Sequence, residues 1–102
     1  MLVVNRFRAE DESFRDDLQA VLTVLGERPG FLSGEIGRNL DDPDLWVLVT
    51  RWESVGGYRR ALSSYEVKVG AVPTLSRALD EPSAYEPVLP GGTLNSAAAR
   101  SL

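Results

Sequence analysis

The chain has 102 residues, of which 43% are hydrophobic and 25% charged, a balance typical of a globular domain rather than a disordered segment. It contains no cysteine and no histidine, which excludes disulfides, thiolate nucleophiles and the commonest ligands of zinc and haem. The formal charge of −4 argues against nucleic-acid binding. No apolar run reaches the ~20 residues of a membrane helix, and the first residues do not resemble a signal peptide, so we expect a cytoplasmic protein without a membrane partner.

The first quarter of the chain predicts a strand followed by a helix. Residues 2–8 alternate apolar and polar side chains and are rich in valine and phenylalanine, which predicts a strand. Ser13, with Asp16 three residues on, resembles a capping box at the start of a helix, and Gly26 can end that helix. The apolar face of the helix is formed at helical spacing by Phe14, Leu18, Val21, Leu22 and Leu25.

The centre of the chain predicts an antiparallel hairpin. Residues 31–40 and 45–53 have the composition of two strands, and the acidic turn between them is short enough to join neighbours. The later strand of this hairpin, which is the third strand of the chain, is apolar on both faces. One face carries Trp46, Leu48 and Trp52, and the other carries Leu45, Val47 and Val49. Helices can cover only one face of the sheet, so we infer a homodimer in which a second copy of the sheet covers the other.

The remainder predicts a helical region, a short strand and a tail. Ser54 can cap the helical region, in which Pro73 predicts a kink or two successive helices. Residues 83–89 predict a fourth strand, and residues 91–102 a flexible tail beyond a single domain of residues 1–90. The order βαββαβ predicts an α+β, ferredoxin-like fold with one antiparallel sheet and the helices on one face. RNA-recognition domains share this order, but these central strands lack their stacking aromatics and the charge is negative.

Three side chains are candidates for a site between the sheet and the helices. Trp52 ends the third strand, Tyr58 follows it, and Asn5 is a polar residue in the apolar first strand. Each carries an N–H or O–H group that can donate a hydrogen bond. The two aromatic residues are also compatible with plain core packing, the commoner role of such side chains in a small domain. The acidic turn 41–44 fits a solvated loop better than a cation site, so we expect no metal.

Three segments resemble the antibiotic biosynthesis monooxygenase (ABM) superfamily of dimeric α/β barrels: Asn5-Arg6-Phe7-Arg8, Arg28-Pro29-Gly30-Phe31 and Leu48-Val49-Thr50-Arg51-Trp52-Glu53-Ser54. The resemblance spans roughly Leu2 to Val88. It implies a homodimer whose two sheets meet and a pocket in each subunit. It also implies cofactor-independent oxygenation of a small aromatic substrate of the anthrone or quinol type, with Asn5, Trp52 and Tyr58 as catalytic residues.

The resemblance also bears on haem. The haem-degrading branch carries a tryptophan and a haem-ligating histidine at the positions that hold Ala61 and Ala71 here. Neither alanine can take those roles, so we expect no haem and no other cofactor. A cofactor-free oxygenase needs only to remove a proton from its substrate and to stabilise an oxyanion. Because the chain has no histidine, the sequence does not identify the group that accepts this proton. Three functions remain: an oxygenase, a small-molecule-binding or isomerase-like dimer, and a structural dimer without a ligand. A pocket of about 300 Å³ or more would favour the first two.

Overall fold

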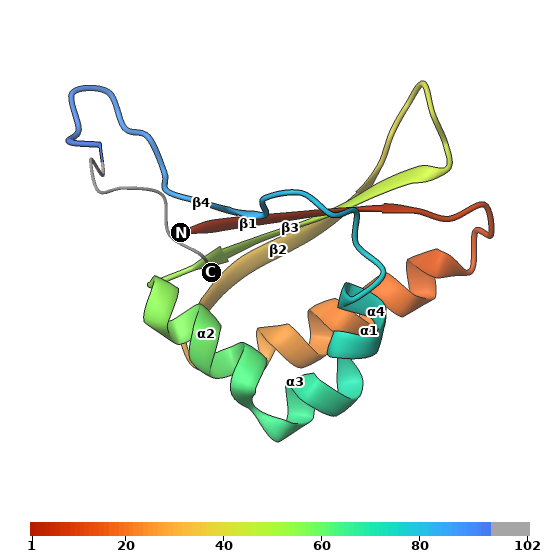
Figure 1. The fold of residues 1–102 in the computed structure, drawn as a ribbon, viewed down its shortest axis with the longest axis horizontal. Coiled ribbons are helices and arrows are strands. Elements are labelled where there is room, and N and C mark those ends of the chain that lie inside the picture. The colour runs from red at the N-terminus through yellow and green to blue at the C-terminus, as the bar shows by residue number, and fades with distance from the viewer. Residues whose placement is uncertain (95–102) are drawn as a thin grey trace.

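The structure, a computed structural model, describes residues 1–94. Within that range the elements follow the order β1 (Leu2–Arg8), α1 (Phe14–Gly26), β2 (Phe31–Arg38), β3 (Leu45–Trp52), α2 (Val55–Ser63), α3 (Tyr65–Gly70), α4 (Val72–Leu75) and β4 (Ala84–Tyr85). The strands form one antiparallel sheet in the order β2-β3-β1-β4. Figure 1 shows the helices together on one side of this sheet, which confirms the α+β ferredoxin-like fold.

Helix α1 begins where the apolar spacing predicts, but the predicted capping box is wrong. Ser13 has helical backbone angles, and its side chain makes no capping hydrogen bond. Asp11 acts in its place, because its carboxylate accepts the Ser13 N–H at 2.8 Å and its carbonyl accepts the Phe14 N–H at 3.0 Å. The hydrogen bonding of its carboxylate with Ser13, chiefly with the backbone N–H, lowers the pKa of Asp11. A charged acceptor two residues upstream therefore replaces the serine hydroxyl at this helix end.

The second helical region consists of three short helices rather than the predicted one or two. The Ser54 hydroxyl accepts the Gly57 N–H at 3.0 Å, which confirms the predicted cap of α2. Ser64 has an extended backbone that ends α2, and its hydroxyl accepts the Val67 N–H at 3.4 Å to cap α3. Pro73 lies in the first turn of α4, where a missing N–H breaks no helical hydrogen bond. The serine, in addition to the proline, divides the region.

The last strand is shorter than predicted. Only Ala84 and Tyr85 pair with β1, opposite Val3 and Leu2. Pro87 follows closely and has no N–H to donate to a sheet. Of the predicted tail 91–102, residues 95–102 lie outside the described part of the chain. Within residues 1–94, no helix combines the length and the apolar character needed to cross a bilayer.

The two faces of the sheet differ as the alternation predicts. The face towards the helices carries the buried core, which includes Val3, Phe7, Trp46, Leu48 and Trp52 from the strands and Phe14, Leu18, Val21 and Leu25 from α1. The opposite face, called the open face below, carries the half-buried apolar side chains Leu2, Val4, Leu45, Val47 and Val49. Figure 1 shows the turn between β2 and β3 and the segment after β4 rising on the side of the open face.

Candidate functional site

A cavity of about 210 Å³ lies between α2 and the sheet edge formed by β1 and β4. Its walls are formed by Met1, Val55, Tyr58, Arg59, Leu62, Ser83 and Ala84. Four of these residues come from α2 and repeat at the i, i+3, i+4, i+7 spacing, so one face of a single helix forms one wall. The cavity therefore combines an apolar interior with a few groups that can donate hydrogen bonds.

Tyr58 joins the cavity to the hydrophobic core. Its ring packs against Trp52 with 5.4 Å between the ring centroids. Its hydroxyl makes no hydrogen bond with residues 1–94. Burial raises the pKa of Tyr58 above its ordinary value, because an apolar environment disfavours the phenolate. The side chain is therefore a neutral hydrogen-bond donor at neutral pH, with a smaller fraction in the phenolate form than a tyrosine in water.

Trp52 forms the layer behind Tyr58. The side chain is only 1% exposed, and its indole packs edge-on against Phe31 with 5.3 Å between centroids. Its N–H donates to the Thr50 hydroxyl oxygen at 2.9 Å, and Trp52 is not among the residues that line the cavity. The single N–H of the indole is thus already bonded inside the protein.

The loop before β2 holds α2, and with it Tyr58, against the core. Gly30 has a φ of 90°, a left-handed conformation that favours glycine. A Cβ atom at this position would lie 3.6 Å from the Cα of Gly57, so the loop and the first turn of α2 approach closely. The Gly30 carbonyl accepts the Glu53 N–H at 2.8 Å and links the same loop to the end of β3.

Asn5 lies on the helix-facing side of β1 but outside the cavity wall. It pairs with Leu48 of β3, a buried core residue, and cross-strand partners share a face. The Asn5 side chain is half-buried and makes no hydrogen bond with residues 1–94. The structure thus brings Trp52 and Tyr58 into contact and places Asn5 elsewhere on the same face of the sheet.

Two polar residues of the cavity, Arg59 and Ser83, were not predicted from the sequence. Arg59 follows Tyr58 and shares the cavity-lining face of α2, whereas Ser83 precedes β4. The helical spacing of Val55, Tyr58, Arg59 and Leu62 was the available signal for the arginine. No comparable signal in the sequence points to Ser83.

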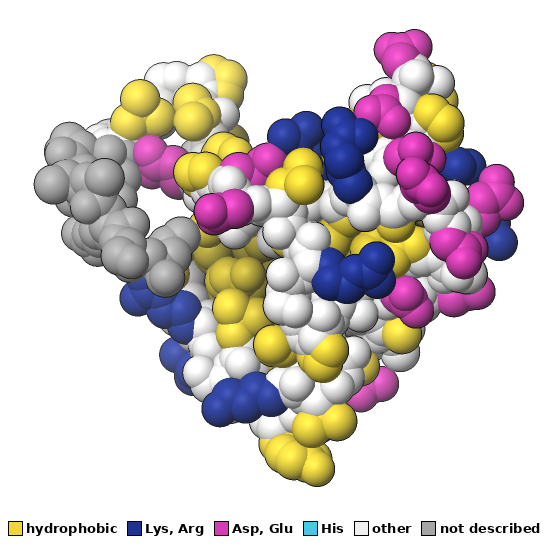
Figure 2. Space-filling model, turned by 45° about the vertical axis from the view of Figure 1, so that its right-hand side comes forward, with side chains coloured by type: hydrophobic (Ala, Val, Ile, Leu, Met, Phe, Trp, Pro, Cys, Tyr) yellow, Lys and Arg dark blue, Asp and Glu magenta, His cyan; other side chains and the backbone are white. Residues whose placement is uncertain are grey.

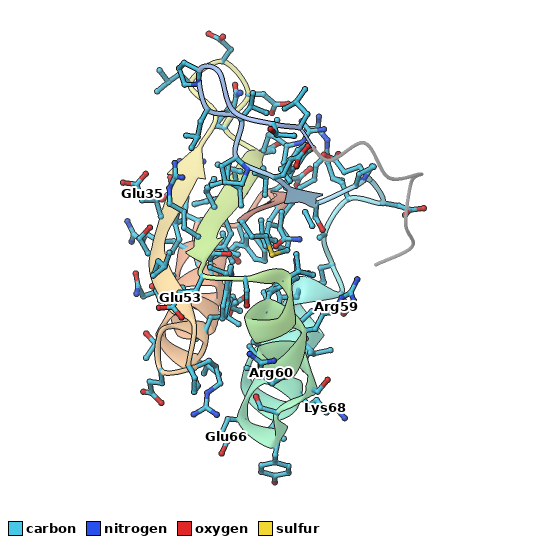
Figure 3. The ribbon with its side chains drawn as sticks, turned by 90° about the vertical axis from the view of Figure 1, so that its left-hand side faces the viewer. Glu35, Glu53, Arg59, Arg60, Glu66 and Lys68 are labelled. Atoms are coloured by element: carbon cyan, nitrogen blue, oxygen red, sulfur yellow. The ribbon has the colours of Figure 1, made fainter. Side chains whose placement is uncertain are left out.

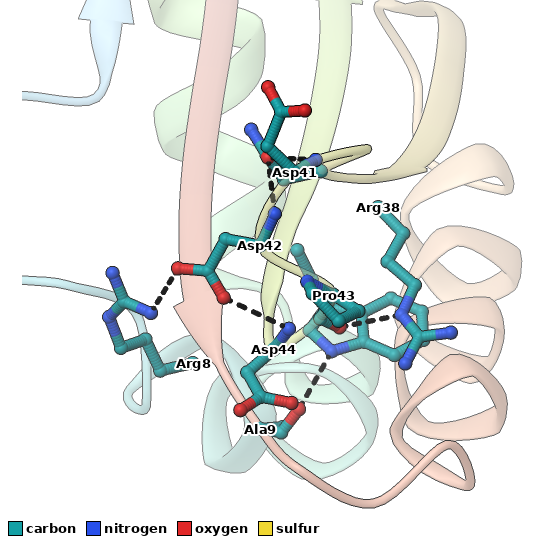
Figure 4. A network of polar contacts seen from close by, with 9 residues as sticks. Arg8, Ala9, Arg38, Asp41, Asp42, Pro43 and Asp44 are labelled. Carbon is teal, nitrogen blue, oxygen red and sulfur yellow. Dashed lines mark hydrogen bonds and ion pairs between the residues drawn. The ribbon is translucent and has the colours of Figure 1, made fainter.

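One carboxylate of the acidic turn between β2 and β3, that of Asp42, is bonded within the protein (Figure 4). The Asp42 carboxylate accepts hydrogen bonds from Arg8 at 2.8 Å and from the Asp44 N–H at 3.3 Å, and the bond to Arg8 lowers its pKa. Arg38 donates to the Pro43 carbonyl at 2.6 Å. In the part of the chain that the structure describes, no three His, Cys, Asp or Glu side chains lie together in a way that could hold a metal ion.

Comparison with known proteins gives one family and several similar folds. The model of the antibiotic biosynthesis monooxygenase family matches residues 1–71. Among solved structures, SnoaB, a cofactor-independent oxygenase from Streptomyces nogalater, is 20% identical, with a TM-score of 0.72 over 86% of this chain and 93% of that one. Rv0793 from Mycobacterium tuberculosis is 20% identical, with a TM-score of 0.68 over 89% and 97%. A conserved protein from Methanosarcina mazei Go1 is 17% identical, with a TM-score of 0.60 over 81% and 84%. No curated protein matches the chain. Identities this low carry the fold alone.

Proposed function

The chain belongs to the antibiotic biosynthesis monooxygenase family, and from this premise we propose that it is a cofactor-independent oxygenase acting on a single-ring aromatic substrate of the hydroquinone type. The observation that carries the proposal is the apolar cavity with Tyr58 in its wall. A cavity of about 150 Å³ can hold benzene, whereas drug-sized ligands need about 300 Å³ or more. A volume of about 210 Å³ falls short of the roughly 300 Å³ expected for a larger ring system, and it therefore favours one substituted ring over a three-ring anthrone.

The reaction needs no external reductant, because the substrate supplies the electrons. A hydroquinone loses a phenolic proton, and its anion reduces dioxygen. One oxygen atom enters the ring to give a hydroxyquinone, and the other leaves as water. The substrate loses four electrons and dioxygen gains four, so the overall change from hydroquinone and O₂ to hydroxyquinone and H₂O is balanced.

The protein's role in this proposal is to hold the ring and stabilise negative charge. The Tyr58 hydroxyl donates a hydrogen bond to the oxyanion, which an apolar site strengthens because water competes less. Trp52 acts through Tyr58, because the contact between the two rings fixes the position of the hydroxyl. Asn5 can donate only to a ligand that extends beyond the cavity along β1.

A second function, ligand binding without oxygen chemistry, is favoured by one specific observation. The raised pKa keeps Tyr58 protonated at neutral pH, so almost no phenolate is present to accept a proton, and no other titratable side chain that accepts a proton at neutral pH lines the cavity. If substrate ionisation does not occur at useful rates, the same cavity serves a binding protein.

Oxygen uptake with hydroquinone and methylhydroquinone tests the proposal. Uptake above the spontaneous rate, with one ¹⁸O atom from ¹⁸O₂ in the hydroxyquinone and one in water, is the expected result. Tyr58→Phe should lower the rate about 100-fold, as the loss of one oxyanion donor does in other enzymes. Tyr65→Phe is the matched control, because Tyr65 is 77% exposed on α3. Equal rates for wild type and Tyr58→Phe would refute the role of the hydroxyl, and binding without uptake would favour the second function.

In the same proposal the chain works as a homodimer, with a second copy covering the open face. At the centre of this face Val4 of β1 pairs with Val49 of β3, and Leu2, Val47 and Leu45 extend the apolar surface between the flanking arginines of the two strands. Leu40, at the turn that rises on this side, is 99% exposed, and Val88 and Leu89 after β4 are each 69% exposed. Side chains of this kind are placed to contact a subunit that packs on the sheet.

Light scattering at micromolar concentration tests the dimer. The wild type should have twice the mass of one chain, and Val49→Asp should be monomeric, because it places a charge in the centre of the proposed interface. Thr23→Asp, on the exposed side of α1, is the matched control and should stay dimeric. Circular dichroism checks that both variants fold. A monomeric wild type, or a Val49→Asp variant that remains dimeric, would contradict the proposal.

A further inference from the structure

The polar side chains that line the cavity beside α2 are hydrogen-bond donors, and none of them is acidic. Its polar side chains are the Tyr58 and Ser83 hydroxyls and the Arg59 guanidinium, and no acidic side chain lines it. The two hydroxyls and the guanidinium can all donate hydrogen bonds, whereas a carboxylate wall, which would attract a cation, is missing. Figure 2 shows the larger group of acidic side chains at the end of the molecule that holds the β2–β3 turn and the start of α1, and a smaller group towards the other side. The cavity thus favours negative charge on its ligand.

Within residues 1–94, Arg59 is the arginine that lines this cavity, and its guanidinium is free of protein partners, as are those of Arg15, Arg51 and Arg60 away from the cavity. Ion pairs hold Arg6, Arg8, Arg28, Arg38 and Arg77 to carboxylates of the protein. The Arg59 guanidinium makes no ion pair or hydrogen bond with residues 1–94. An unpaired guanidinium beside an apolar cavity is a suitable group for a carboxylate or phenolate, which it can bind through two parallel N–H donors.

The next residue along the helix gives an internal comparison. Arg60 does not line the cavity, and its guanidinium lies near Gly56 at the start of α2. Figure 3 shows Arg59 beside the segment that leads to β4, whereas Arg60 points to another side of the helix. Both arginines are exposed and carry the same charge, so they differ mainly in access to the cavity.

We propose that the cavity selects anionic single-ring aromatics, with Arg59 as the residue that determines this specificity. The inference rests on the proposed function for the shape of the ligand, and it extends that function by assigning the charge. A ring carrying a carboxylate would place its apolar part against Val55, Leu62 and Ala84 and its charge against Arg59. For a hydroquinone, the same guanidinium favours the ionised phenol, the form that reacts with oxygen.

Two ligands of equal size separate charge from shape. At pH 7 the carboxyl group of 4-hydroxybenzoate is ionised, whereas 4-hydroxybenzamide is neutral. Isothermal titration calorimetry should show the benzoate binding the wild type about tenfold more tightly than the amide. Arg59→Gln should remove this preference while still binding the amide, and Arg60→Gln should keep it. The preference should also weaken between 0.05 M and 0.5 M salt, because screening acts on the charged ligand alone.

The outcomes separate this inference from the proposed function. Equal affinity of the wild type for the two ligands, equal losses in Arg59→Gln and Arg60→Gln, or no binding of either ligand would overturn the inference. Neither ligand needs to react with oxygen, so a preference that depends on Arg59 supports the inference even if no hydroquinone is oxidised. Conversely, oxygen uptake with neutral hydroquinones and no preference for the anion would leave the oxygenase standing and refute the selectivity.

Discussion

The hydrogen bond between Trp52 and Thr50 allows a direct test of how the core behind the cavity is held. The Thr50 side chain is 2% exposed, and its hydroxyl accepts the Trp52 indole N–H at 2.9 Å. Thr50→Val keeps the shape of the side chain but removes the acceptor, so a buried N–H is left without a partner. A buried N–H without a partner lowers the free energy of unfolding by about 1–3 kcal/mol. Part of this loss is offset, because the valine variant no longer buries a hydroxyl group.

We therefore expect Thr50→Val to lower the free energy of unfolding by about 1–2 kcal/mol, with a fall in Tm of about 5–15 °C for a domain of this size. A double-mutant cycle with Trp52→Phe isolates the contribution of the hydrogen bond. The cost of replacing the indole by the smaller ring is the same with threonine and with valine at position 50 and therefore cancels in the cycle. The coupling free energy should be about 1–2 kcal/mol. Urea unfolding followed by circular dichroism measures all four proteins at one protein concentration, because the stability of the proposed dimer would depend on concentration.

A coupling free energy below about 0.3 kcal/mol would refute this reasoning, since it would mean that the two side chains contribute independently. Neither Thr50 nor Trp52 lines the cavity, so the affinity of Thr50→Val for a cavity ligand should equal that of the wild type. A large loss of affinity at unchanged fold would show that the indole N–H has a direct role at the site.

Two further substitutions test the sheet. A Cβ atom on Gly34 would clash with the Leu22 side chain of α1 and would lie 3.2 Å from Phe31 and 3.3 Å from Thr50, so Gly34→Ala should destabilise the protein by about 1–3 kcal/mol in thermal unfolding. Gly26→Ala, whose Cβ meets only an ordinary contact at 3.8 Å, should not, and equal stabilities would contradict this packing. The Arg6 guanidinium donates two hydrogen bonds, of 3.0 and 2.7 Å, to the Glu81 carboxylate and lowers the pKa of Glu81. The pair therefore stabilises the fold fully at pH values above the ordinary pKa of a glutamic acid. This stabilisation is lost as the pH falls through the lowered pKa of Glu81 in the folded protein. Unfolding of Glu81→Gln should therefore differ from wild type at pH 6 and converge with it at strongly acidic pH, whereas a difference that is independent of pH would exclude the ion pair as its cause.

The fold was predictable because its signals are strong and local. The alternation in β3 places Trp46, Leu48 and Trp52 on one face, and the same three side chains are buried against the helices. The α1 face follows equally well from its spacing. The helix ends were less predictable, because several acceptors compete at each end. Asp11 displaced Ser13 as the cap of α1, although both residues have side chains suited to the position.

The site was predictable only in part, because a cavity depends on how elements meet and not on the pattern within one element. Tyr58 was identified from its place after β3, and its contact with Trp52 agrees with that reasoning. Arg59 was missed because a charged residue on a short helix is normally solvated, and its position matters only once β4 closes the other side of the cavity. The partner of the Trp52 N–H lies two residues away in the same strand, and alternation places the two side chains on one face without indicating a bond.

The absence of histidine changes how the proposed chemistry has to be divided between protein and substrate. A protein base is usually needed to remove a proton from a weak acid, but the Tyr58 hydroxyl has a raised pKa and remains protonated. A hydroquinone can lose its proton to water instead, provided that the site stabilises the resulting anion. Tyr58 as a donor and Arg59 as a cation both act in this direction, and both stand on the same face of α2. Stabilising the product of ionisation therefore takes the place of a base, and this division of roles requires the site to lower the pKa of the bound hydroquinone well below that of a phenol in water.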